Sequence, residues 1–71
     1  MNASANELAK TWLRDKANGL RHSAGLARSA YRHSEKMVAA CTRVARAYER
    51  AAAVLDEEAH FIERDEQKEN P

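Results

Sequence analysis

A single apolar seam runs through most of the chain, with positions at alternating spacings of four and three residues. Its thirteen members, of which only Ser34 is polar, are Leu20, Ala24, Ala27, Tyr31, Ser34, Val38, Cys41, Ala45, Tyr48, Ala52, Leu55, Ala59 and Ile62. This spacing is typical of a long α-helix that packs against another helix. Because no proline interrupts it and Ala, Arg and Glu favour helix, we predict a long helix over residues 21–66.

A shorter helix precedes the long one. Leu8, Trp12 and Leu13 share one helical face, and Ser4 or Asn6 can cap the start, so we predict a helix over residues 5–17. Asn18-Gly19 is the strongest turn signal, because both residues tolerate the left-handed conformation common after a helix C-terminus. We therefore expect a turn at residues 18–20. Residues 67–71 are polar, with carboxylates at the unfavourable end of the helix dipole, and we expect a frayed tail.

The long helix has one alternative interpretation. Ser34-Glu35 could cap a new helix, which would divide the segment into residues 22–33 and 35–66. We prefer the continuous helix, because neither glycine nor proline marks the proposed break.

The chain is too short to cover the whole seam by itself. Seventy-one residues allow one domain, near the lower limit for a self-sufficient core. A helix over 21–66 would be roughly 69 Å long, whereas the first helix spans about 20 Å and can shield the seam only to about Val38. We therefore predict an all-α helical hairpin that dimerises into a bundle or coiled coil, with this interface: Tyr31, Val38, Cys41, Ala45, Tyr48, Ala52, Leu55, Ala59 and Ile62.

Charge favours an antiparallel homodimer. Residues 20–50 hold seven basic and two acidic side chains, while residues 51–71 hold seven acidic and two basic ones. An antiparallel pair lays the basic half of one helix along the acidic half of the other, whereas a parallel pair stacks like charges.

The basic side chains form a stripe opposite the seam. The guanidinium groups of its arginines could bind the phosphates of a nucleic-acid backbone. The stripe comprises Arg21, Arg28, Arg32, Lys36, Arg43, Arg46 and Arg50. A formal net charge of only +1 favours the simpler interpretation, a solvated outer face. Nucleic-acid binding is therefore the alternative function.

Catalytic, metal and cofactor sites are not expected. His22, His33 and His60 form no ligand pair on one helix face, and no nucleophile has a base at a supporting spacing. Cys41, the one cysteine, sits in the seam and is interpreted as a small buried hydrophobe. A lone thiol, together with no secretory signal or apolar membrane span, makes a cytoplasmic, membrane-independent protein the default expectation.

The preferred function is a non-enzymatic helical dimer that binds and modulates a protein partner of unknown identity. Adaptors and small inhibitors, such as phages and plasmids often encode, are of this kind. Phe61, beside the seam, is the candidate partner anchor. A third interpretation is a subunit of a larger helical assembly.

Overall fold

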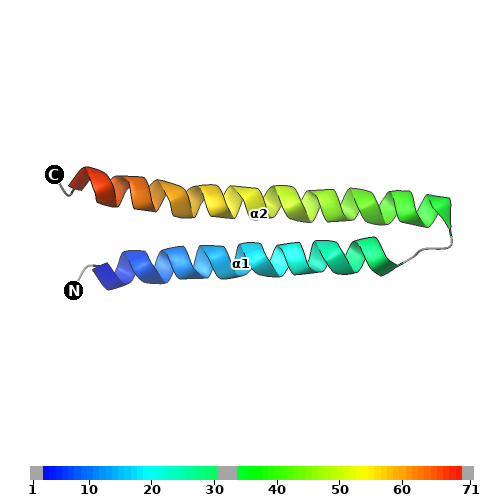
Figure 1. Ribbon diagram of the computed structural model, residues 1–71, viewed down its shortest axis with the longest axis horizontal. Helices are drawn as coiled ribbons and strands as arrows, with labels where there is room; N and C mark the ends of the chain where they lie inside the picture. The colour runs from blue at the N-terminus through cyan, green and yellow to red at the C-terminus, as the bar shows by residue number, and fades with distance from the viewer. Residues whose placement is uncertain (1–2, 31–33, 70–71) are drawn as a thin grey trace.

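The protein is an antiparallel hairpin of two α-helices, seen in a computed structural model that describes residues 3–30 and 34–69. α1 spans Ala3–Ala30 and α2 spans Glu35–Glu69, and the two lie side by side along their length (Figure 1). The Cα atoms occupy 56 × 17 × 10 Å, so the molecule is a thin rod. The all-α hairpin expected from the sequence is confirmed. Neither described helix is long and apolar enough to cross a membrane.

The turn predicted at residues 18–20 is wrong, because Asn18 and Gly19 lie inside α1. Neither residue has a positive φ, and the Arg21 guanidinium donates to Asn18 Oδ1 at 3.5 Å, one helical turn away. Glycine costs only about 1 kcal/mol in a helix interior. Ala17 and Ala24, which flank the pair, are both buried against α2, and this packing requires the helix to continue. The first helix is therefore longer than the predicted 5–17.

The chain instead changes direction before Ser34, so the continuous 21–66 helix is not observed. The Ser34 hydroxyl accepts a hydrogen bond from the Met37 amide at 3.4 Å, and the Ser34 carbonyl accepts from Val38 at 2.8 Å. These contacts make Ser34 the N-cap of α2. Of the alternative division, the start of a helix at Glu35 is observed, but residues 22–30 continue α1 instead of forming a separate helix. α2 continues to Glu69, so residues 67–69 of the predicted tail are helical rather than frayed, and residues 70–71 lie outside the described residues.

A central row of residues spaced by seven joins the two helices. Its members are Lys10, Ala17 and Ala24 on α1 and Ala45, Ala52, Ala59 and Glu66 on α2. All five alanines are buried, and they are the whole apolar core of the described chain. Lys10, in the α1 part of this row, forms an ion pair of 2.6 Å with Glu66, in the α2 part. Small side chains let two helices pack closely.

α2 extends past the end of α1 (Figure 1). α2 begins at Glu35, and its first residues form the part that α1 does not cover. Residues 35–40, here called the overhang, are exposed without exception. Met37 and Val38 are its large apolar side chains.

Candidate interaction surfaces

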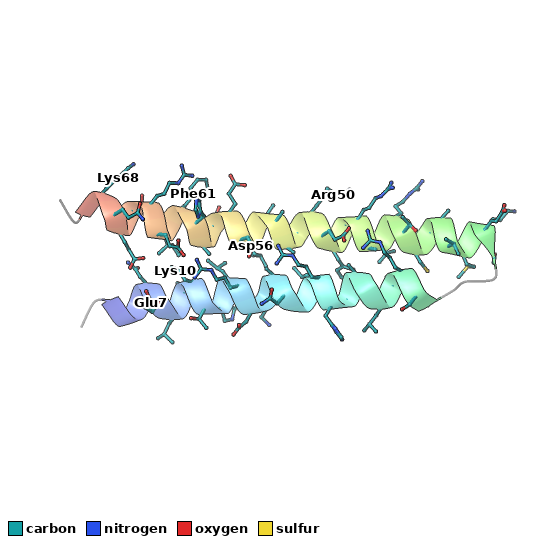
Figure 2. The ribbon with its side chains drawn as sticks, in the orientation of Figure 1. Glu7, Lys10, Arg50, Asp56, Phe61 and Lys68 are labelled. Carbon is teal, nitrogen blue, oxygen red and sulfur yellow. The ribbon has the colours of Figure 1, made fainter. Side chains whose placement is uncertain are left out.

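One side of the hairpin is closed by ion pairs between α1 and α2. Each partner lies four residues after a member of the central row, and the pairs repeat every seven residues: Arg14–Glu63, Arg21–Asp56 and Arg28–Glu49. Arg28 binds both carboxylate oxygens of Glu49 at 2.6 Å. Asp56 points from α2 toward α1 (Figure 2). We call this the ion-pair side.

Two carboxylates neutralise the one charged residue in the central row. Lys10 is 7% exposed, and its Nζ lies 2.6 Å from Glu66 and 2.7 Å from Glu7. Figure 2 shows Glu7 and Lys10 near the start of α1. The hydrogen bonds to Glu66 and Glu7 raise the pKa of Lys10, and the bond from Lys10 lowers the pKa of Glu7. A buried lysine is tolerated here because its charge is paired.

Charge pairing also shifts pKa values at the end of the ion-pair side that is nearest the connection between the helices. The hydrogen bonds from Arg28 lower the pKa of Glu49, and those bonds also raise the pKa of Arg28. Both groups therefore stay charged across the physiological pH range, and this side offers a partner few unpaired groups.

The opposite side is apolar. Its residues lie three positions after members of the central row, and we call them the apolar side: Leu13, Leu20 and Ala27 on α1 with Cys41, Tyr48, Leu55 and Ile62 on α2. All except Tyr48, which is exposed, are half-buried. A shallow hollow on this side is lined by Trp12, Lys16, Leu20, Ser23 and Leu55, with the Lys16 ammonium 5.5 Å from the Trp12 ring centroid.

The predicted dimer interface is divided among three places. Ala45, Ala52 and Ala59 pack against α1 of the same chain. Val38 lies on the overhang, and four further residues lie on the apolar side: Cys41, Tyr48, Leu55 and Ile62. Tyr31 lies outside the described residues.

The candidate partner anchor, Phe61, is exposed on α2. The Arg64 guanidinium carbon lies 4.7 Å from its ring centroid, so a cation covers part of the ring. Cys41 is a free thiol and half-buried, rather than fully buried as the sequence suggested.

The predicted basic stripe is divided between the helices. Arg21 and Arg28 lie on α1 in ion pairs, Arg32 lies outside the described residues, and the rest of the stripe is on α2. Arg43, Arg46 and Arg50 line a second hollow together with Ala39 and Thr42. Arg50 points away from α1 (Figure 2). Among the residues that the structure describes, these three arginines have no ion-pair partner.

Sequence reasoning missed the ion-pair side, although the signal was present. Arg14, Arg21 and Arg28 recur at intervals of seven, as do Glu49, Asp56 and Glu63. Two such rows of opposite charge indicate an antiparallel pairing of the helices that carry them.

In the described part of the chain, no three His, Cys, Asp or Glu side chains are grouped as a metal site would require. No protein-family model, curated protein or solved structure matches the chain.

Proposed function

We propose that this chain is a non-enzymatic helical protein that forms an antiparallel homodimer and binds a protein partner through its apolar side. The observation that carries the proposal is the hollow in which Leu20 of α1 and Leu55 of α2 meet beside Trp12. Trp12 is 58% exposed. Tryptophan is one of the residues that contribute most to binding energy in protein interfaces, so an exposed tryptophan beside this hollow supports a binding role. The chain would modulate its bound partner, acting as an adaptor or a small regulatory inhibitor.

The two sides of the hairpin support this assignment of the binding surface. On the ion-pair side, each arginine already has a carboxylate partner from the other helix. On the apolar side, leucine, isoleucine and tyrosine side chains keep part of their surface in water. A row of such side chains on one side is a feature of protein-binding surfaces.

Self-association is supported by how little the single hairpin buries. No large side chain in the described residues is fully buried. The Cα radius of gyration is 16.5 Å, compared with about 11 Å for a globular domain of this length. A core made of alanines alone supplies little hydrophobic free energy, so a second copy would add what the single chain lacks.

The test is affinity capture from the native cell with and without nuclease, using the tagged chain and two variants. Leu20→Lys/Leu55→Lys places charges in the hollow. Leu8→Lys is the matched control, because Leu8 is 71% exposed and lies outside the apolar side. We expect a protein partner that survives nuclease, is lost with the double variant and is retained by the control. A partner retained by the double variant would refute the proposed surface.

Nucleic-acid binding is the second candidate, supported by the three arginines that line the hollow on α2. Arginine forks match phosphate geometry, and such binding weakens steeply with salt. We expect Arg43→Gln/Arg46→Gln/Arg50→Gln to abolish a gel shift. The control, Arg14→Gln/Arg21→Gln/Arg28→Gln, removes equal charge from arginines that already have partners. No gel shift at low salt would refute this candidate.

A further inference from the structure

The spacing of the central row continues unchanged through the connection between the helices. Ala24 on α1 and Ala45 on α2 are three intervals of seven apart, and Val38 falls on the same row. A hairpin does not require this agreement, because a connection can have any length. Only about one connection length in seven keeps two helices in the same heptad phase.

The ion pairs between the two helices have their sequence midpoints close to Val38. Lys10 and Glu66, for example, form an ion pair, and Val38 lies midway between them in sequence. An antiparallel pair of continuous helices with its twofold axis close to Val38 would therefore repeat these ion pairs between copies, with Lys10 of one copy beside Glu66 of the second. Each contact along the central row would recur between copies.

We infer that two copies of this chain exchange helices. In the exchanged dimer α1 and α2 join into one continuous helix, and α1 of each copy packs against α2 of the other. This inference rests on the homodimer in the proposed function and specifies how it forms. Exchange of an identical element is a low-cost route to a dimer, because the contacts of the monomer are reused.

Composition at the connection fits a segment that can become helical. The chain has no glycine after Gly25 and no proline before Pro71. The N-cap contacts of Ser34 would be replaced by the backbone hydrogen bonds of a continuous helix. The overhang would gain a partner, because the overhang of one copy would lie beside the overhang of the second. The exchanged state therefore adds buried apolar area that the hairpin leaves exposed.

The test measures a distance within one chain by double electron–electron resonance. Spin labels are placed at Asn18→Cys and His60→Cys in a Cys41→Ala background, since Asn18 and His60 are exposed. In the hairpin the labels lie about 20 Å apart across the two helices. Within one continuous helix they are about 63 Å apart. Labelled chains are refolded with a large excess of unlabelled chains, so that each labelled chain pairs with an unlabelled one.

A second variant blocks exchange without disturbing the hairpin. Glu35 is the first residue of α2 after the N-cap, where proline is tolerated. Within a continuous helix the same proline removes a backbone hydrogen bond and clashes. Glu35→Pro should therefore keep the short distance after dilution, whereas the control Glu35→Ala should behave as the parent chain.

The outcomes separate the two proposals. A long distance after dilution, restored to the short one by Glu35→Pro, supports helix exchange. A dimer that keeps the short distance after dilution refutes exchange but leaves the proposed homodimer standing. A chain that remains monomeric at every concentration refutes both.

Discussion

Two stretches of α2 follow the same heptad row but differ in what lies opposite them. Ala45 is 0% exposed where α1 is close, whereas Val38, one interval earlier on the overhang, is 38% exposed. The sequence pattern does not change between these positions. What changes is the presence of a second helix. The comparison shows that the pattern specifies a packing surface longer than α1 can cover, and we propose a second copy as the partner, because its own row has the same spacing.

The largest expected effect comes from a substitution in the overhang, the stretch of α2 that α1 does not cover. In the exchanged dimer, Val38→Asp would bury two carboxylates close to the twofold axis, a cost on the order of 3–5 kcal/mol. In the single hairpin Val38 is exposed, so the monomer should keep its helical circular dichroism. Size-exclusion chromatography over a concentration series should show the dimer lost. Ala40→Asp, also on the overhang but off the row, should leave the dimer intact; equal behaviour of the two variants would contradict an axis close to Val38.

The covered stretch is tested by overfilling it. Ala52 is fully buried between the helices, so Ala52→Leu forces them apart at a cost of about 1–3 kcal/mol. Ala53→Leu adds the same side chain at an exposed neighbour and should be nearly neutral. Thermal unfolding followed by circular dichroism measures both. Equal melting temperatures for the two variants would show that the alanine row does not hold the helices together.

The ion-pair side should contribute less to the stability of the hairpin than the alanine row does. Arg21→Glu places like charges together opposite Asp56, and the reversed pair Arg21→Glu/Asp56→Arg should recover most of the loss. Exposed pairs contribute about 0–1 kcal/mol, and salt screens them. The melting temperature of the single variant should therefore approach that of the parent chain in high salt. A difference that does not depend on salt would point to packing rather than charge.

The smallest expected effect is on acid stability. Arg28 and Lys10 lower the pKa values of Glu49 and Glu7 below their ordinary range in the folded chain. Their stabilisation is therefore complete above the unfolded carboxyl pKa, about 4.3, and is lost as pH falls through the lowered folded values. Melting temperatures measured against pH should decline in that acidic window. Glu7→Gln/Glu49→Gln should flatten the decline; an unchanged profile would exclude these two groups as its source.

The sequence predicted the helical seam but not where the chain reverses. The seam from Leu20 to Ile62 was readable because one long heptad pattern contains it. Asn18-Gly19 misled because a local turn preference of about 1 kcal/mol per residue is outweighed by burying Ala17 and Ala24. Ser34 was visible only as an alternative, since a cap residue in a helical pattern does not itself require a break.

The predicted surfaces were wrong for the same reason, the unpredicted position of the chain reversal. The basic stripe assumed one helix, so Arg21 and Arg28 were expected to lie in line with Arg43. Reversal before Ser34 puts Arg21 and Arg28 on the other helix, where the register brings Asp56 and Glu49 to them. The alanines assigned to the dimer interface were instead buried within the chain for the same reason.

The most direct measurement of the central claim compares two cysteine positions under mild oxidant. In the antiparallel exchanged dimer, the two copies of residue 38 lie close to the twofold axis, whereas each Cys41 is three residues, or about 4.5 Å along its helix, further from that axis. A disulfide needs Cα atoms within about 7 Å. Val38→Cys in a Cys41→Ala background should therefore form a covalent dimer quickly, and the parent chain, with Cys41 alone, slowly. Equal rates at the two positions, or faster cross-linking through Cys41, would contradict the account.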